Sequence, residues 1–190
     1  STDPVAGAYE YGLDVAATVA ANPGVGWELS HWQLDGEHAG DVNPLIVPSA
    51  AEGEAKTLQA IFAPKHYALT YSAGDNGSVA GDPVQTVEHG QDGSVVEAVA
   101  EAGYHFVQWS DGLATPARQE TNVTKPITVE AQFAINSYTV TFDVGEHGTY
   151  TGGGDLTQHV DHGGSAAEPT VDADAGWTFA GWSVPFDNVT

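Results

Sequence analysis

The chain has 190 residues, with no cysteine and no methionine, and its 26 acidic and 4 basic side chains give a formal net charge of −22. This charge repels phosphate backbones and anionic lipid surfaces, so we expect no nucleic-acid partner and no attraction to a membrane surface. No apolar run approaches the roughly 18 residues of a membrane-spanning helix, so we expect no direct membrane insertion, and the lack of cysteine excludes disulfide bonds and thiolate metal sites.

Alternating apolar and polar residues predict strands along the whole chain. The segments Tyr67–Tyr71 and Tyr138–Phe142 both alternate with a period of two. Gly74–Gly77 and Gly145–Gly148 follow these strands and tolerate positive φ, so we predict a hairpin turn at each. Since no window shows a capped helical stripe, the predicted fold class is mainly β. Further strands are predicted, in chain order, at Val84–Glu88, Ser94–Glu101, Tyr104–Trp109 and Ile127–Phe133.

The same blocks recur along the chain. Gly103–Trp109 is repeated as Gly176–Trp182 and, more loosely, as Gly26–Trp32, while Tyr67–Tyr71 is repeated as Tyr138–Phe142. Self-similarity at a fixed period is the signature of a tandem array. We therefore predict an elongated array of small β-sheet repeats. The predicted boundaries are 1–64 for repeat one, which lacks its first hairpin, 65–136 for repeat two, which is complete, and 137–190 for repeat three, which lacks its last strand.

A change of parity in the repeated block predicts a β-bulge. Phe106 and Trp109 are three positions apart, so a regular strand would place them on opposite faces. One extra residue at this point, where repeat three has Gly181, would return the tryptophan to the core side. We interpret the aromatic residues of the repeats as structural core anchors, and the alternative is that they stack against a ligand. The predicted anchors are Trp32, Phe62, Tyr67, Phe106, Trp109, Phe133, Tyr138, Phe142, Phe179 and Trp182.

Repeat three resembles the Listeria–Bacteroides repeat, also called the internalin B-repeat. Tyr138–Phe142 and Gly176–Trp182 carry this resemblance. The resemblance implies a small β-grasp-like module that is repeated in secreted and cell-wall proteins of bacteria. It also implies a non-catalytic role as a spacer or interaction module in adhesins, with no catalytic residues to transfer.

Repeats one and two resemble the divergent internalin B-type repeat. Gly103–Gly112 and Val129–Ala134 carry the resemblance in repeat two. In repeat one Trp32 and Gln59–Ala63 match, but Leu29 stands where phenylalanine is usual.

Two histidines near the end of the chain invite a metal-binding interpretation. His159 and His162 would face opposite sides of a strand, although a turn at Gly163 and Gly164 would let them converge. Zinc needs three or four ligands with second-shell support. We therefore predict solvated loop histidines and no metal ligands.

Carboxylates also cluster, at Asp35 to Asp41 and at Asp172 to Asp174. Calcium takes six to eight converging oxygens, and neither cluster follows a known calcium-loop spacing. We expect no cofactor, and weak, diffuse Ca²⁺ binding to a solvated acidic face stays open.

Nucleophilic or acid–base catalysis finds no support. The Ser110-Asp111-Gly112 segment lacks the Gly-x-Ser-x-Gly elbow, and Val184 in repeat three stands where repeat two has Asp111. A small unit whose acids differ between copies is a poor host for a catalytic cleft. We predict that the chain is not an enzyme.

The predicted function is mechanical. We expect an extracellular, surface-protein or adhesin segment, processed or excised from a longer chain, that acts as a spacer, stalk or filament-building module. Its partners would be other domains of the same surface protein or neighbouring subunits. The alternative is a module that binds a glycan or a host protein through exposed aromatic faces. An exposed flat aromatic flanked by Asp or Gln would favour the alternative; the candidate faces are Trp27, Trp32, Tyr104 and Trp177.

The two ends carry a separate expectation. Repeats one and three each lack a strand, and an unpaired sheet edge invites strand addition from another chain. Three interpretations stay open: a slice of a longer array, degenerate terminal caps, and head-to-tail assembly through Ser1–Tyr11 or Val184–Thr190.

Overall fold

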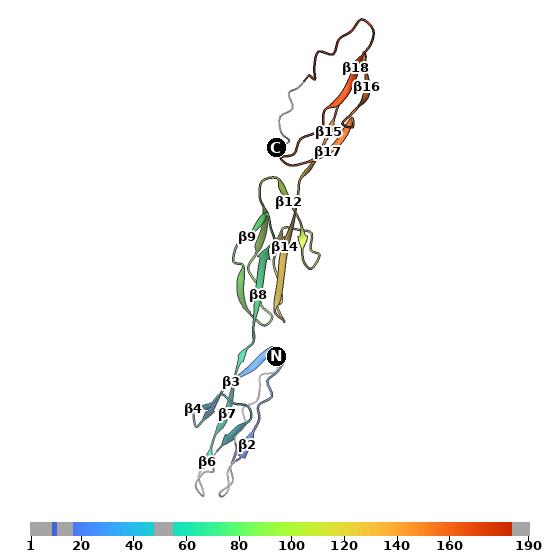
Figure 1. The fold of residues 1–190 in the computed structure, drawn as a ribbon. Helices are drawn as coiled ribbons and strands as arrows, with labels where there is room; N and C mark the ends of the chain where they lie inside the picture. Colours follow the sequence, from blue (N-terminus) through green and yellow to red (C-terminus); the bar gives the residue numbers. More distant parts are fainter. Residues whose placement is uncertain (1–8, 11–16, 48–54, 184–190) are drawn as a thin grey trace. The chain divides into compact units, whose positions relative to one another are not determined.

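The computed structural model describes residues 9–10, 17–47 and 55–183, and every helix or strand in these ranges is a β-strand. The predicted mainly β fold class is therefore confirmed. The strands form small sheets of two to four members (Figure 1). None of the described segments is a helix of the length and apolar character that crossing a membrane requires.

The first of two compact units comprises Ser1–Thr70, Val84–Val95 and Gln119–Thr128. Its three-stranded sheet has the antiparallel order β4-β3-β7, and two further pairs are β2 with β5 and β1 with β6. The strands that lie wholly in this unit are β1 (Tyr9–Glu10), β2 (Ala17–Val19), β3 (Trp27–Leu34), β4 (Glu37–Gly40), β5 (Leu45–Val47), β6 (Ala55–Lys56), β7 (Leu58–Pro64) and β10 (Val84–Glu88).

Repeat one has its own buried cluster within this unit. Trp32 of β3, Leu45 and Val47 of β5, and Leu58 of β7 pack together. In β5 the two end residues are buried and the central Ile46 is exposed, as the two-residue period of a strand requires. The cluster therefore rests on one tryptophan and three aliphatic side chains.

The second compact unit comprises Tyr71–Pro83, Val96–Arg118 and Val129–Thr190. It holds a three-stranded sheet of order β13-β11-β9 and the two-stranded pairs β15-β17 and β16-β18. The strands that lie wholly in this unit are β9 (Gly77–Ala80), β11 (Val96–Ala100), β12 (Tyr104–Trp109), β13 (Ala117–Arg118), β15 (Ser137–Thr141), β16 (Gly148–Gly153), β17 (Thr157–Asp161) and β18 (Pro169–Ala173).

Strands β8 (His66–Ala73) and β14 (Ile127–Ile135) each contribute residues to both units and lie in a four-stranded sheet of order β10-β8-β14-β12. The register between β12 and β14 shifts between Phe106 and Gln108. The predicted bulge is therefore confirmed, and it places Trp109 in the core with no exposed surface. In repeat one, β3 and β7 shift in the same way between Leu29 and His31, and Trp32 is buried.

The turns at Gly74–Gly77 and Gly145–Gly148 exist, but they do not form the predicted hairpins. β8 and β9 flank the first turn, yet β8 pairs with β10 and β9 pairs with β11. Likewise, β15 pairs with β17 and β16 pairs with β18. Each turn thus carries the chain from one sheet to another. The sequence signal for a turn specifies local φ, and it does not specify which strands pair across it.

The structure leaves two predictions as they were. The division into compact units passes through repeat two, so the boundaries 1–64, 65–136 and 137–190 stay a prediction. The end-to-end assembly through Ser1–Tyr11 or Val184–Thr190 concerns segments that lie almost entirely outside the described residues. Among the described strands, β15 of repeat three pairs only with β17, whereas its counterpart β8 lies between β10 and β14.

Candidate functional site

The first joint, where repeat one passes into repeat two, consists of Gly26, Lys65, Tyr67 and His89. The N–H of Lys65 donates to the carbonyl of Gly26, and the N–H of His89 donates to the carbonyl of Lys65, each at 2.8 Å. Lys65 therefore extends the β3–β7 ladder and the β8–β10 ladder by one step each. The imidazole of His89 lies beside Tyr67, with a contact of 3.3 Å between the Tyr67 hydroxyl and Nδ1.

The second joint, where repeat two passes into repeat three, consists of Gly103, Asn136, Tyr138 and His162. The N–H of Asn136 donates to the carbonyl of Gly103, and the N–H of His162 donates to the carbonyl of Asn136, again at 2.8 Å each. The His162 ring lies 6.2 Å from the Tyr138 ring, between ring centroids. The side chain of Asn136 also contacts Nδ1 of His105 at 2.9 Å. The same four-residue arrangement is therefore built twice in one chain.

Each joint requires its glycine for two separate reasons. Gly26 and Gly103 have φ of +80° and +85°, a region that side chains other than glycine rarely enter. A Cβ on either glycine would also collide with the histidine ring of the following repeat. The histidine ring thus lies directly on the glycine backbone. Sequence reasoning interpreted His162 as a solvated loop residue and did not single out His89. The two histidines follow the tyrosines of their joints at different spacings, so no fixed spacing in the repeat marked them.

Gly103→Ala should displace the His162 ring from the second joint. Without the ring, the hydrogen bond from the Asn136 N–H to the Gly103 carbonyl should be more exposed to solvent. If the substitution weakens this bond by the value of one hydrogen bond, about 1 kcal/mol, the Asn136 amide should exchange its hydrogen roughly fivefold faster. Gly112→Ala and Gly176→Ala are matched controls, because these glycines have φ of +91° and +89° and nothing within 4 Å of a Cβ. If all three variants increased the exchange rate of the Asn136 amide equally, the effect would come from backbone strain at a substituted glycine and not from loss of the histidine contact.

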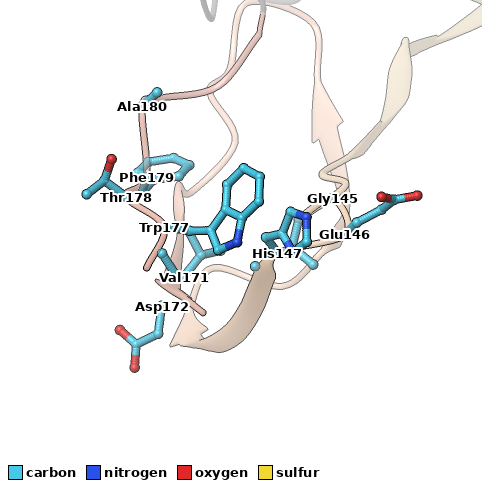
Figure 2. A pocket seen from close by; sticks show the side chains of 12 residues that line it. Gly145, Glu146, His147, Val171, Asp172, Trp177, Thr178, Phe179 and Ala180 are labelled. Carbon is cyan, nitrogen blue, oxygen red and sulfur yellow. The ribbon is translucent and has the colours of Figure 1, made fainter. Parts of the chain in front are cut away.

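Trp177 stacks on His147 in repeat three, and we call this ring pair the aromatic shelf. The ring centroids are 3.8 Å apart with 13° between the planes, and Figure 2 shows the two rings facing each other, with the carboxylates of Asp172 and Glu146 pointing away from them. Trp177 is 58% exposed. Asp174, three residues before Trp177, lies 3.7 Å from Nδ1 of His147. The shelf is therefore an exposed flat aromatic surface with acidic residues around it.

Phe179 next to the shelf differs from the prediction that it anchors a core, because half of its surface is exposed. In repeat two the equivalent Phe106 packs edge-on against Phe133 of the closing strand β14. The described residues of repeat three include no counterpart of that strand. Among the described residues, Phe179 makes an edge contact with Trp182, which matches the edge contact of Phe106 with Trp109.

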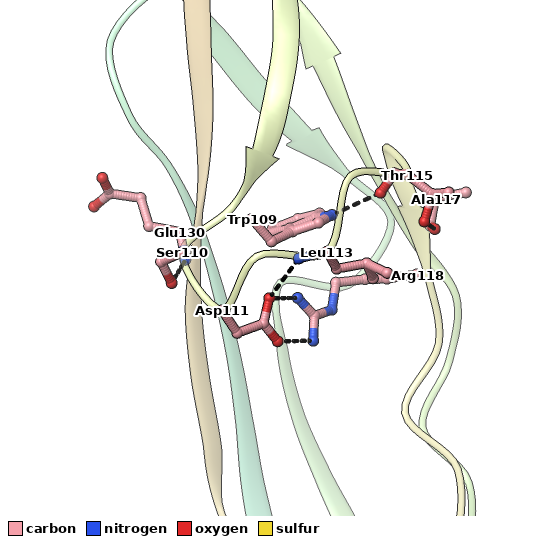
Figure 3. Close-up of polar contacts among 8 residues, drawn as sticks. All are labelled: Trp109, Ser110, Asp111, Leu113, Thr115, Ala117, Arg118 and Glu130. Carbon is pink, nitrogen blue, oxygen red and sulfur yellow. Dashed lines mark hydrogen bonds and ion pairs between the residues drawn. The ribbon is translucent and has the colours of Figure 1, made fainter.

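A buried cation braces the core of repeat two (Figure 3). Arg118 has a side chain that is 4% exposed, and its two terminal nitrogens donate to the two carboxylate oxygens of Asp111 at 3.2 and 3.0 Å. Its guanidinium lies 5.0 Å from the Trp109 ring centroid and 5.8 Å from that of Tyr71, within cation–π range. Trp109 in turn donates its indole N–H to the carbonyl of Thr115. The sequence analysis missed Arg118, although a lone arginine in a chain this poor in cations was a signal.

Hydrogen bonding lowers the pKa of two carboxyl groups. The bidentate bond from Arg118 is the main cause at Asp111, with the Leu113 N–H adding to it and partial burial opposing it. At Asp35 the main cause is the backbone N–H of Thr57, and the ammonium of Lys56 at 3.4 Å adds to it. Asp111 therefore holds the guanidinium of the buried Arg118 in place.

The side chains considered as metal ligands contact other partners. His159 contacts the hydroxyl of Thr139 and His162 belongs to the second joint, so the two imidazoles do not converge. Asp41 pairs with His38, and Asp174 lies beside His147. Within residues 9–10, 17–47 and 55–183, no group of three or more metal-binding side chains comes together.

The acidic excess predicts that stability rises with salt. With a net charge of −22, the folded chain repels itself, and ions screen that repulsion over a Debye length of about 10 Å at 0.1 M. We expect the melting temperature to rise between low salt and about 0.5 M NaCl, and CaCl₂ to act at lower concentration. A melting temperature that stays flat across this range would mean that the fold already compensates its charges.

Comparison with known families matches two adjoining stretches of the chain. Residues 67–137 match the divergent InlB B-repeat domain, and residues 138–185 match the Listeria–Bacteroides repeat domain. The predicted resemblance is confirmed for repeats two and three, and neither matched stretch includes repeat one. Internalin H of Listeria monocytogenes is 36% identical in a match that covers 45% of this chain and 15% of Internalin H. The chain therefore spans only a small part of this curated relative, and the comparison with solved structures found no match. B-repeats of this kind point to a bacterial surface protein, and both matched domains are repeat modules.

The predicted core anchors are unevenly buried across the B-repeats. Trp32, Trp109 and Phe142 are buried, and Phe179 is half exposed. Phe142 packs edge-on against Trp182 at 5.2 Å, as Tyr71 packs against Trp109 in repeat two. The remaining anchors are partly buried: Phe62, Tyr67, Phe106, Phe133, Tyr138 and Trp182.

Proposed function

We propose that this chain is a non-catalytic spacer or stalk segment of an extracellular bacterial surface protein. The observation that carries the proposal is the repeated joint. One residue, Lys65 or Asn136, is hydrogen-bonded to the repeats on both of its sides, and a histidine ring lies on the glycine of the preceding repeat. A connection of this type leaves no free linker between repeats, which suits a module that sets a distance.

The partners in this proposal are other domains of the same surface protein, or neighbouring subunits where the segment builds a filament. A net charge of −22 keeps separate copies soluble by repulsion, so a neighbouring subunit of the same kind would have to be held by specific contacts. The B-repeat matches to surface-protein modules support the location.

Single-molecule energy transfer across the second joint tests the spacer role. The chain has no cysteine, so Glu97→Cys with Thr149→Cys provides two unique labelling sites on exposed strand residues of repeats two and three. A spacer should give one narrow distance distribution that His162→Ala broadens. A distribution that is already broad in the unaltered joint would contradict the spacer function.

A glycan-binding module is the second candidate, and the aromatic shelf favours it. Trp177 is flat, 58% exposed and bordered by Asp172, which meets the criterion of an exposed aromatic with acidic neighbours. Of the other three faces, Trp32 is buried, Tyr104 is partly buried and Trp27 is 39% exposed. Under this candidate function, soluble oligosaccharides would stack on Trp177.

Titration with cell-wall and host oligosaccharides, followed by calorimetry, separates the two functions. Binding that Trp177→Ala abolishes and Trp27→Ala leaves intact would establish the glycan role. Absence of binding to the unaltered chain would leave the spacer function alone.

A further inference from the structure

The turn at Gly176 is a third copy of the glycine turn that forms both joints. In all three, the residue after the glycine donates its N–H to the carbonyl three positions earlier, with Trp27, Tyr104 and Trp177 as the donors at 3.1, 3.0 and 2.9 Å. The glycine φ values are +80°, +85° and +89°. The backbone turns at Gly26, Gly103 and Gly176 therefore have the same local conformation.

Among the described residues, no side chain lies on the third glycine turn. A Cβ at Gly26 or Gly103 would strike a histidine ring, whereas one at Gly176 would meet nothing within 4 Å. In the described part of the chain, the Gly176 carbonyl accepts no hydrogen bond, while those of Gly26 and Gly103 each accept one from a connecting residue. The unoccupied turn is followed directly by the exposed Trp177.

We propose that the Gly176 turn is a docking surface for the first strands of another repeat of this type. The partner would supply three groups that both occupied joints use: a connecting N–H for the glycine carbonyl, a histidine ring on the glycine Cα, and a tyrosine beside that ring. Each occupied joint offers these groups from residues just before and within the following repeat. The inference rests on the proposed spacer function, since it identifies the partner of the spacer as another B-repeat.

A glycan is the wrong occupant for this surface. At both occupied turns the histidine ring lies with its face against the glycine, which has no side chain, and among the described residues the glycine backbone bonds to the connecting residue through its carbonyl acceptor. The aromatic shelf is a separate feature, formed by the Trp177 ring stacked on His147. A glycan on that shelf would leave Gly176 itself unchanged.

The test extends the chain and follows the Gly176 Hα resonances by NMR. Residues 1–182 are joined to a copy of residues 110–183, which keeps the repeat register because Trp182 occupies the place of Trp109. The copy supplies a closing strand equivalent to β14, a connecting residue equivalent to Asn136, and the paired strands β15 and β17 with the following His162. Ring current should move the Gly176 Hα signals upfield, toward those of Gly26 and Gly103, and His162→Ala within the copy should reverse the shift. A folded extension without the shift, or a shift that survives this substitution, would overturn the proposal.

A second measurement needs only the chain itself. His162→Ala empties the second joint, so the Gly103 Hα signals should move to the position of those of Gly176. Unmoved signals would mean that the ring does not distinguish the occupied turns from the empty one, and would equally overturn the proposal. The spacer function is judged separately, by the width of the distance distribution between repeats two and three.

Discussion

Trp109→Ala is expected to unfold repeat two at temperatures where the unaltered chain is folded. Trp109 has no exposed surface, and removing a fully buried tryptophan costs about 3–5 kcal/mol. The loss reaches beyond packing, since the ring also faces Arg118 and contacts Tyr71 and Phe106 edge-on. A repeat of this size has few other large buried groups to compensate. Calorimetric melting would show a drop of many degrees in the transition of repeat two.

Trp177→Ala is the matched control for this effect. It removes the same side chain from the same repeated block, but from a position that is 58% exposed. Its stacking on His147 is a surface contact, and we expect a change in the free energy of unfolding below about 1 kcal/mol. Comparable losses in both variants would show that exposure does not determine the role of these tryptophans. An unchanged melting temperature in Trp109→Ala would refute its role as an anchor.

The strands and the bulge could be predicted because their signals are local. The two-residue period located Val84–Glu88 and Tyr104–Trp109 at the bounds that the structure has. The parity conflict between Phe106 and Trp109 required an extra residue, and the register shift lies between them. Steric rules within a few residues were sufficient in each of these cases.

Strand pairing and the joints could not be predicted in the same way. The turn at Gly74–Gly77 is visible in the sequence, but whether its flanking strands pair depends on partners such as β11, which begins 19 residues after the turn. His89 lies on Gly26, 63 positions earlier in the chain. Contacts over such separations follow from how the sheets assemble, and a single sequence carries no local trace of them.

Arg118 shows the same limit at the level of a side chain. A lone arginine is ordinarily a surface residue, yet here it is buried beside two aromatic rings. Its burial requires a carboxylate in the right place, and Asp111 provides it from the loop that follows Trp109. Sequence spacing alone could not reveal this pair, because β11 holds the arginine strand β13 in position.

Asp111→Asn is expected to destabilise repeat two more than the removal of both charges. The substitution removes the charge of Asp111 from the bidentate pair with the buried guanidinium, and hydrogen bonds to charged groups contribute about 1.5–3 kcal/mol. Solvent screens the pair because 46% of the Asp111 side chain is exposed, so we expect a smaller loss, about 1–2 kcal/mol. The double variant Asp111→Asn with Arg118→Met also removes the buried guanidinium and should recover part of the loss. A double variant less stable than Asp111→Asn would contradict this account.

The contribution of Asp111 should also depend on pH. Because Arg118 lowers the pKa of this carboxyl in the folded state, the folded protein binds the proton more weakly than the unfolded chain. The stabilisation is therefore complete above the unfolded pKa of about 4 and is lost as the pH falls through the lower folded value. The other acidic residues titrate in the same range, so the informative quantity is the difference in unfolding free energy between the unaltered chain and Asp111→Asn. Denaturant titrations between pH 7 and pH 2.5 should show this difference constant down to about pH 4 and shrinking below it. A difference that stays constant to pH 2.5 would mean that the carboxylate charge contributes nothing to holding Arg118 in the core.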